Sequence, residues 1–416
     1  MKNVIKNQIA SVLKTSKFYQ NKIGDKIDES LDFDKWFKNL PFTTKKELLE
    51  DQRLYPPFGS FLNVNKNSIK RVHQTSGTTN KPFIIAMTNQ DIEDTVSLGK
   101  TCFSNSGLKE SDIVFHCLSY NMWIGGYTDH QSLEATGATV VPFGVGNTRK
   151  LIDSILLIKP TAIHCTPSYL SKIELVLQNE YGMKPIDLGL RIGLLGAESG
   201  IQNMEFRRNI EKKWGMKAMN ANYGMGDCFS IFASEFEDQT GLFFRGEDYL
   251  YAELINPETE ESISIEDGNE GELVLTNIKK EAQPLIKYRT SDIIRITKSN
   301  EEIKGFFFEV LGRSDDMITV KGVNVYVNVV ENVIFNYLEL LTGLFQIHIN
   351  EMDPVSDFHI YLELKEGLKY PGDNFTNHFI NDCKTKFGIS PSVKYFFEGQ
   401  LPRTQGKTKK LFRDIK

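Results

Sequence analysis

Apolar residues recur at helical spacing near the start of the chain, on a background of lysines and other polar residues. The repeating positions are Ile5, Ile9, Val12 and Leu13. Residues three or four positions apart lie on the same face of a helix, so this stretch predicts an amphipathic helix. A signal peptide would carry one continuous apolar block instead. Helical patterns continue to the turn-forming sequence YPPFG at residues 55–59.

From about residue 110 onward, short apolar runs alternate with helical patterns. The runs predict strands at 112–118, 138–143, 161–166 and 191–196, and the helical patterns predict helices at 151–159, 168–182 and 205–215. Strands that alternate with helices of this length form α/β units around a largely parallel sheet.

The pattern becomes more antiparallel after about residue 240. Strand-like runs occupy residues 243–255, 271–278 and 307–313. A further compact unit follows Gly312, with predicted helices at 328–341 and 374–388 and a strand at 358–365. We therefore expect an α/β fold in two domains. The first, 1–312, is a large domain of mixed sheets and helices, and the second, 313–416, is a small α+β lid that can move.

Composition narrows the class of protein. The 416 residues carry a formal net charge of -5, which argues against bulk nucleic-acid binding because a polyanion partner normally requires a basic domain. No apolar run approaches the roughly 18–20 residues of a membrane helix. The 5 cysteines are scattered without a C-x-x-C pair, which favours buried, reduced thiols and a cytoplasmic setting.

The most informative segment is HQTSGTTNKP, at residues 73–82. It places Thr75, Ser76, Thr78 and Thr79 around Gly77, with Lys81 close behind. Such a loop can offer several hydroxyl and backbone N–H donors to one anion, because glycine removes the side chain that would block close approach. The alternative is an ordinary Ser/Thr-rich turn. The spacing is not that of a Walker A loop.

Four further segments carry residue types suited to a nucleotide. Gly196-Ala197-Glu198 follows a buried strand, where a backbone crevice can accept a flat ring. Asn222-Tyr223-Gly224 supplies an amide for a base edge and an aromatic face for stacking. Asp227 can ligate Mg²⁺ beside phosphates, and Asp292 can accept two ribose hydroxyls. Taken singly, each has an ordinary structural reading: Tyr223 as a core residue and Asp292 as a turn residue.

The order of these segments resembles the adenylate-forming superfamily of acyl-CoA synthetases, adenylation domains and luciferases. Within it, the chain is most similar to the phenylacetate–CoA ligase branch. The matching pieces, besides TSGTTNKP, include LPFTTKKEL (40–48), GGYTDHQSLEATGATVVP (125–142), LGAE (195–198), NYGMGD (222–227), PLIKYRTSDI (284–293), LGRSDDMITVKGVNVYVNVVE (311–331) and LPRTQGK (401–407). The resemblance runs from about residue 40 to the end of the sequence.

The resemblance implies a role for each candidate residue. The 75–81 loop holds the β- and γ-phosphates of ATP, with Thr78 and Lys81 acting in catalysis. Gly196, Ala197, Glu198, Asn222, Tyr223 and Gly224 form the adenine pocket. Asp292 and Arg313 contact the ribose and phosphate, and Asp227 contacts Mg²⁺. Lys407 bridges the acid and the α-phosphate, and Asp315 is the hinge about which the C-terminal domain reorients.

The implied chemistry suits these residue types. A carboxylate must first attack the α-phosphorus of ATP, and lysine charges with Mg²⁺ offset the repulsion between the two anions. The acyl-AMP that results is a good electrophile for a thiol. No G-x-S-x-G elbow is present to support a Ser-His-Asp triad instead.

The segment that borders the acid pocket departs from the branch. Its candidate pocket residues are Tyr120, Met122, Trp123 and Gly125. Phenylacetate ligases typically read Tyr-Gly-Leu-Phe-Thr where this chain has Tyr-Asn-Met-Trp-Ile at 120–124, which argues against phenylacetate itself. Two other departures are Asp227 in place of glutamate and Ser291 in place of glycine or arginine.

We therefore expect an ATP- and Mg²⁺-dependent ligase that joins a small aromatic or medium-sized apolar acid to a thiol. The thiol belongs to coenzyme A or to the phosphopantetheine arm of an acyl carrier protein; the sequence leaves both open. A non-catalytic nucleotide-binding homologue and an amide-forming enzyme are the rival interpretations. No nucleic-acid or membrane partner is expected, and the resemblance makes a homodimer an option on which the sequence itself is silent.

Overall fold

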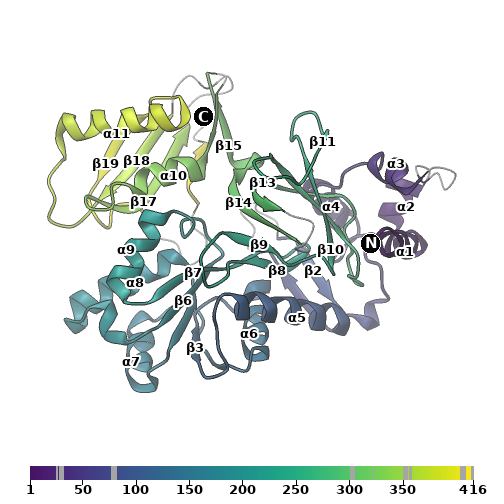
Figure 1. Ribbon diagram of the computed structural model, residues 1–416, viewed down its shortest axis with the longest axis horizontal. Coiled ribbons are helices and arrows are strands. Elements are labelled where there is room, and N and C mark those ends of the chain that lie inside the picture. Colours follow the sequence, from purple (N-terminus) through teal and green to yellow (C-terminus); the bar gives the residue numbers. More distant parts are fainter. Residues whose placement is uncertain are drawn as a thin grey trace.

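The structure is a computed structural model that describes residues 1–24, 27, 32–75, 82–299, 305–321, 323–349, 355, 358–402 and 409–413 (Figure 1). The chain begins with four helices: α1 (Lys2–Thr15), α2 (Lys17–Ile23), α3 (Phe33–Lys38) and α4 (Lys45–Leu54). Helix α1 buries Ile5, Ile9 and Val12, so the amphipathic pattern of the first residues is confirmed. No helix among the described residues is long and apolar enough to cross a membrane.

The central feature is a 12-stranded sheet, and the strands of one half of it run parallel to one another. Its parallel strands are β3 (Ile113–His116), β4 (Thr139–Pro142), β5 (Ala162–Cys165), β6 (Ile192–Gly196) and β7 (Lys217–Met225), in the order β7-β6-β5-β3-β4. Strands β3, β4, β5 and β6 lie where the alternating apolar runs predict them. Every residue of β5 and β6 is buried, as expected for strands covered on both faces.

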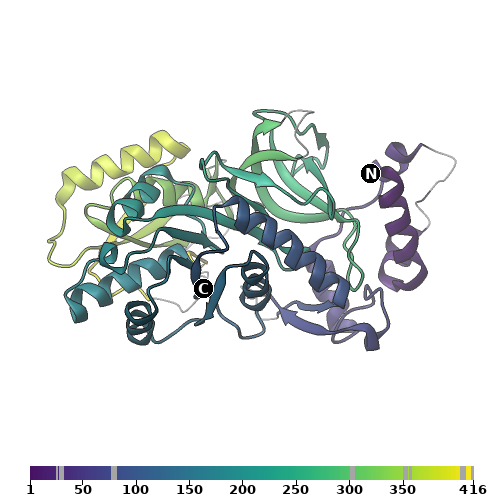
Figure 2. The same cartoon turned by 60° about the horizontal axis from the view of Figure 1, so that its bottom comes forward.

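Two helical layers cover this half of the sheet. One contains α5 (Asn89–Asn105) and α6 (Ile124–Ala135), and the other contains α7 (Thr148–Ile158), α8 (Pro167–Val176) and α9 (Met204–Trp214). Neighbouring residues of one strand join different cores: Leu194 packs with Phe103 of α5, whereas Leu195 packs with Trp214 of α9. Figure 2 shows α5, in dark blue, running along its face of the sheet.

The other half of the sheet is antiparallel. Its strands are β8 (Phe229–Ser234), β9 (Leu242–Phe244), β10 (Leu250–Ile255), β11 (Ser262–Ile263), β12 (Glu270–Asn277), β13 (Tyr288–Ser299) and β14 (Phe306–Arg313), in the order β11-β10-β12-β13-β14-β9-β8. A separate hairpin of β1 (Arg71–Gln74) and β2 (Ile84–Met87) flanks the predicted phosphate loop.

The chain after β14 builds its own sheets and its own core. It contains β15 (Met317–Val320), β16 (Val323–Tyr326), α10 (Val327–Phe335), β17 (Leu341–Ile349), β18 (His359–Leu364), α11 (Gly372–Phe387), β19 (Ser392–Phe396) and β20 (Leu411–Arg413). Its core residues form a cluster distinct from the others. Figure 1 shows this part, in yellow and green, lying over α8 and α9.

One predicted element is wrong at its end. The apolar pattern predicts a helix over 328–341, but α10 ends at Phe335, and Leu341 begins β17. Leu341 is fully buried and pairs with Leu364 of β18. The apolar residues near 341 therefore serve a buried strand, and a short apolar run does not by itself distinguish a strand from a helix.

Candidate active site

The candidate residues gather at one edge of the parallel sheet. Gly196 ends β6, Asn222 and Tyr223 lie near the end of β7, and the segment 120–125 follows β3. The carboxyl ends of parallel strands meet at the same edge, which is where open α/β sheets bind their ligands. Three segments that are far apart in the sequence are thus brought together by the sheet.

Gly196 and Asn222 are direct neighbours across β6 and β7. A Cβ atom on Gly196 would lie 1.3 Å from Oδ1 of Asn222, so any side chain at position 196 would displace this amide. The next residue, Ala197, has φ +64°, a left-handed backbone that alanine rarely adopts. Strain of this kind is held by the surrounding structure and clusters at functional sites.

Tyr223, Asp292, Arg313 and Asp315 form one chain of hydrogen bonds. The Tyr223 phenol donates to Asp292 Oδ2 at 2.5 Å, and Arg313 donates to Asp292 Oδ1 at 2.7 Å. The Arg313 guanidinium also holds the hinge candidate Asp315 through two bonds of 2.8 and 2.9 Å. Burial raises the pKa of the Tyr223 phenol well above its usual value, so the phenol stays a proton donor.

Asp227 is buried and already has two partners. Its Oδ2 atom accepts a 2.6 Å hydrogen bond from the Tyr288 phenol and lies 3.0 Å from the Lys45 ammonium. Among the described residues, no group of three His, Cys, Asp or Glu side chains could hold a metal ion by itself. A single carboxylate nevertheless fits Mg²⁺ that arrives with phosphates, because Mg²⁺ keeps several waters and needs only one or two protein carboxylates.

The start of the predicted phosphate loop is bonded to the acid-pocket segment. The backbone N–H of Gln74 donates to the Met122 carbonyl at 2.8 Å, and His73 Nδ1 lies 3.2 Å from the same oxygen. The other ring nitrogen of His73 is buried without a partner. Thr75 closes the strand pair through its hydroxyl, which accepts from the Phe83 N–H at 3.3 Å.

Several predicted loop residues lie outside the described residues. They are Ser76, Gly77, Thr78, Thr79 and Lys81, together with Lys407 near the end of the chain. Their predicted roles in phosphate binding and catalysis stay predictions.

The segment 120–125 mixes aromatic and strained residues. Met122 has φ +51°, and Trp123 caps the start of α6 with its ring 2.7 Å from where a Cβ on Gly125 would lie. Tyr120 hydroxyl lies 3.0 Å from His130 Nδ1, and its ring meets the His116 ring edge to face. Tyr120 therefore contacts two histidines.

A buried polar network lies directly beneath it. The Asn222 amide donates to Asp129 Oδ2 at 3.1 Å and to His164 Nε2 at 3.2 Å. His164 Nδ1 lies 2.8 Å from His116 Nδ1, and His116 Nε2 lies 2.7 Å from the Gly126 carbonyl.

These contacts assign the protons of both rings. An amide nitrogen can only donate, so His164 accepts at Nε2 and carries its proton on Nδ1. That proton bonds to His116 Nδ1, which leaves the His116 proton on Nε2, facing Gly126. Burial lowers the pKa of His116 to about 4 and lowers that of His164 well below its usual value, so both rings are neutral. Burial also raises the pKa of Asp129 well above its usual value.

Sequence reasoning missed several of these residues. Lys45 and Tyr288 lie in the matching pieces 40–48 and 284–293 but were assigned no role there, and they come to Asp227 from these distant segments. The two histidines did leave a trace: each ends a predicted strand as the dipeptide His-Cys, at 116–117 and at 164–165. The parallel register pairs His116 with His164, so this repetition could have predicted their contact.

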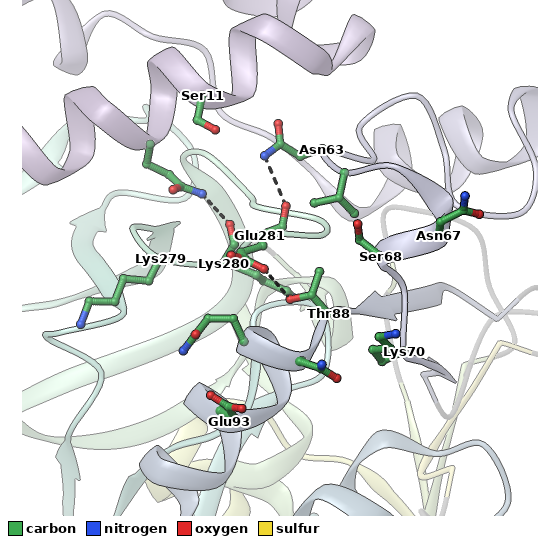
Figure 3. Close-up of a pocket in the computed structure, with 14 residues that line it drawn as sticks. Ser11, Asn63, Asn67, Ser68, Lys70, Thr88, Glu93, Lys279, Lys280 and Glu281 are labelled. Atoms are coloured by element: carbon green, nitrogen blue, oxygen red, sulfur yellow. Dashed lines mark hydrogen bonds between the residues drawn. The ribbon is translucent and has the colours of Figure 1, made fainter.

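A cavity of about 880 Å³ lies elsewhere on the molecule (Figure 3). It is open and polar, and its walls come from α1, the 63–70 segment, the start of α5 and residues 279–281. Lys280 turns its ammonium to the carbonyls of Asp227 and Cys228, at 2.7 and 2.9 Å. None of the candidate site residues lines this cavity.

The fold and the gathered residues define an adenylate-forming enzyme, and a family model supports this class. The model for the AMP-binding enzyme C-terminal domain matches residues 322–414. Phenylacetate-coenzyme A ligase of Pseudomonas putida is 31% identical over 376 residues, which cover 88% of this chain and 82% of that protein. The enzyme of the same name from Escherichia coli K12 is 31% identical over 383 residues, covering 90% and 84%. The chain belongs to the phenylacetate-coenzyme A ligase family.

Solved structures show the same fold. 2-Hydroxyisobutyryl-CoA ligase in its postadenylation state, in complex with 2-HIB-AMP, superposes with a TM-score of 0.87 at 21% identity, covering 99% of this chain and 88% of that one. The same ligase in its thioesterification state, with 2-HIB-AMP and CoA, gives a TM-score of 0.69, covering 100% and 89%. The whole chain therefore superposes more closely on the first of those structures than on the second.

Proposed function

We propose that the chain catalyses the ATP-dependent ligation of a small aromatic carboxylic acid to the thiol of coenzyme A, by way of an acyl-AMP. One observation carries the proposal most directly: Asp292 is held between Tyr223 and Arg313 beside the glycine-lined end of β6. A carboxylate has about four lone-pair positions, so Asp292 can still accept two ribose hydroxyls after both existing bonds.

The neighbouring residues supply the other parts of a nucleotide site. Gly196 and Ala197 give the adenine a surface free of long side chains, and Tyr223 gives it an aromatic face. Asn222 and Glu198 each keep a buried oxygen without a hydrogen-bond partner, Oδ1 and Oε1. Such acceptors suit the exocyclic amine of adenine, because an unpartnered buried acceptor gains most from a donor.

The reaction has two steps, and each balances. In the first, a carboxylate oxygen of the acid attacks the α-phosphorus of ATP, and pyrophosphate leaves. In the second, the CoA sulfur attacks the acyl carbon, loses its proton, and AMP leaves. The reaction thus consumes ATP and CoA, and it requires Mg²⁺. When bound with ATP, Mg²⁺ would neutralise phosphate charge, and Asp227 is the carboxylate proposed to hold it.

Two lysines of the sequence complete the proposed machinery. Lys81 in the phosphate loop and Lys407 near the end of the chain meet the phosphates and the attacking carboxylate. By analogy with a single oxyanion donor, one positioned lysine supplies roughly 3–4 kcal/mol, or ~10²–10³ in rate. We further propose that residues 1–312 carry the nucleotide and acid sites, and that residues 313–416 reorient about Asp315 between the two steps.

The acid pocket is proposed to lie between the 120–125 segment and the end of β7. Tyr120, Met122, Trp123 and Gly125 border it, with the polar network of Asn222 and His164 behind. The aromatic residues favour an aryl acid. A pantetheinylated carrier protein is the alternative acceptor, since it presents the same thiol, and a homodimer is the proposed assembly.

Acid-dependent exchange of pyrophosphate into ATP tests the proposal. Phenylacetate, benzoate, anthranilate, 2-hydroxyisobutyrate and hexanoate form the panel, and Lys407→Ala is the control variant. Exchange with one acid, lost in the variant, is expected. Nucleotide binding without exchange for any acid, unchanged in Lys407→Ala, would favour a non-catalytic homologue. Thioester formation with CoA, compared with a pantetheinylated carrier, then identifies the acceptor.

A further inference from the structure

Three side chains meet where the C-terminal part touches the rest of the chain. Lys410, directly before β20, forms an ion pair with Glu331 of α10, and its ammonium donates to Ser199 Oγ at 3.2 Å. Ser199 in turn donates to the second oxygen of Glu331 at 2.5 Å. Ser199 directly follows Gly196-Ala197-Glu198, so this triad docks on the edge of the proposed adenine pocket.

The two charged residues of the triad are more buried than charged residues usually are. The Glu331 side chain is 4% exposed and that of Lys410 is 22% exposed. Both charges belong to the C-terminal part, whereas Ser199 belongs to the N-terminal part. The ion pair can therefore persist when the two parts separate, but its burial and its bond to Ser199 depend on their present arrangement.

The contacts beside the triad come from the same two surfaces. Asn203 donates to Asn332 at 3.2 Å, and the rings of Phe206 and Phe335 stack with centroids 4.4 Å apart. Glu331 and Phe335 are four residues apart, so one face of α10 makes these contacts. The stack supplies apolar burial, and the triad supplies directional bonds.

The Lys410 charge also acts on Glu198, a residue of the proposed adenine pocket. Burial raises the pKa of the Glu198 carboxyl, and the Lys410 ammonium acts in the opposite direction. Glu198 has one buried oxygen without a partner. A lysine of the C-terminal part therefore acts electrostatically on a residue of the proposed nucleotide site.

We propose that Lys410 is a positioning residue for the first half-reaction, acting through Glu331 and Ser199; this rests on the proposed function. The triad holds the C-terminal part in the arrangement of the structure, which is that of the postadenylation state of the 2-hydroxyisobutyryl ligase. In the sequence, Lys410 follows the proposed catalytic Lys407 by three residues. Loss of the Ser199 bond accompanies the change to the second half-reaction.

The test separates the two half-reactions in the full-length protein. Lys410→Ala is compared with wild type in pyrophosphate exchange, using the panel acid that gives most exchange. Thioester formation is then measured from that acid's chemically prepared acyl-AMP and CoA, without ATP. We expect exchange to fall about tenfold or more, as for a lost hydrogen bond to a charged group, and thioester formation to change less than about twofold.

Three variants serve as controls. Lys409→Ala removes the same charge from the neighbouring, exposed position and should leave both half-reactions unchanged. Lys410→Arg should restore most of the exchange. Ser199→Ala removes only the exposed hydroxyl of the N-terminal part, and it should lower exchange in the same direction even if Lys410→Ala folds poorly.

Two results would overturn the proposal while leaving the proposed function in place. One is an equal loss of both half-reactions in Lys410→Ala and Ser199→Ala, which a purely structural role would give. The other is unchanged exchange in both variants. Absence of exchange and of thioester formation in the wild type would overturn the proposed function, and this proposal with it.

Discussion

The phenol of Tyr223 donates a hydrogen bond of 2.5 Å to the carboxylate of Asp292, although 69 residues separate them in the sequence. Tyr223 lies on β7 and Asp292 on β13, and the Tyr223 ring is held edge to face by Phe232 and Phe308. The bond fixes the aromatic face and the carboxylate relative to each other before any nucleotide binds.

Tyr223→Phe should weaken ATP binding while leaving the fold intact. The ring keeps its packing, but Asp292 loses one of its two donors. Bonds to charged groups contribute about 1.5–3 kcal/mol, so we expect the KM for ATP to rise about tenfold or more. Pyrophosphate exchange at varied ATP concentration measures this, with Tyr223→Ala as the more severe control. An unchanged KM in Tyr223→Phe would show that the phenol does not position the carboxylate.

Asp227→Asn and Lys45→Met should shift the magnesium requirement in opposite directions. The asparagine variant loses the charge that holds the ion, so the half-saturating Mg²⁺ concentration should rise about tenfold. In the structure the Lys45 ammonium lies 3.0 Å from Asp227 Oδ2 and competes for the same oxygen. Its removal should therefore lower the half-saturating concentration. Pyrophosphate exchange, measured at fixed ATP and varied Mg²⁺ concentration, tests these shifts. Shifts in the same direction for both variants would contradict the proposal that Asp227 binds Mg²⁺.

The stability of the protein should fall on acidification because of the buried histidines. The pKa of His116 is about 4 in the folded chain and near 6.5 when unfolded, and that of His164 is also depressed. Below pH 6.5 the unfolded state binds more protons, so the free energy of unfolding decreases as the pH falls. At pH 5.5 the loss from His116 is about 1.4 kcal/mol. His164 contributes in the same direction.

Urea unfolding between pH 7.5 and 5 checks this slope. His116→Gln with His164→Gln should be less stable at pH 7.5 but should show a flatter dependence. The raised pKa of Asp129 acts in the opposite sense, since its protonated form favours the folded state as the pH falls. The contribution of Asp129 remains in the double variant. The difference in slope between wild type and variant therefore reports the contribution of the two histidines alone. Parallel slopes would refute the neutral assignment.

Ser291→Gly should stabilise the protein. Ser291 has φ +63°, a left-handed backbone that costs a side-chain-bearing residue about 1–2 kcal/mol. Glycine adds about 0.4–1 kcal/mol of unfolded-state entropy, so the net gain is between about 0 and 1.6 kcal/mol. The midpoint of urea unfolding measures this gain. Ser291→Ala is the control, because alanine keeps a Cβ atom and so does not relieve the backbone strain. A lower midpoint for the glycine variant would count against strain at this position.

Local patterns in the sequence predicted the fold class and the identity of many candidate residues. The alternating runs of 112–196 gave β3, β5 and β6 because a strand buried on both faces must be apolar throughout. The helix predicted at 205–215 ends at a glycine, and in the structure Gly215 is its C-cap with φ +64°. The order of the nucleotide motifs was sufficient to indicate an adenylate-forming ligase, because each motif is a short segment with its own composition.

Only the tertiary structure decided which of those residues meet. Asp227 receives Lys45 from 182 residues away, and Ser199 receives Lys410 from 211 residues away. Such contacts depend on sheet register and on the path of the chain between elements, and a local sequence pattern predicts neither of these. The end of α10 at Phe335 was missed for the same reason: a local pattern does not show that Leu341 pairs with Leu364 of β18. Local propensity selects the elements, whereas burial of the whole core selects their partners.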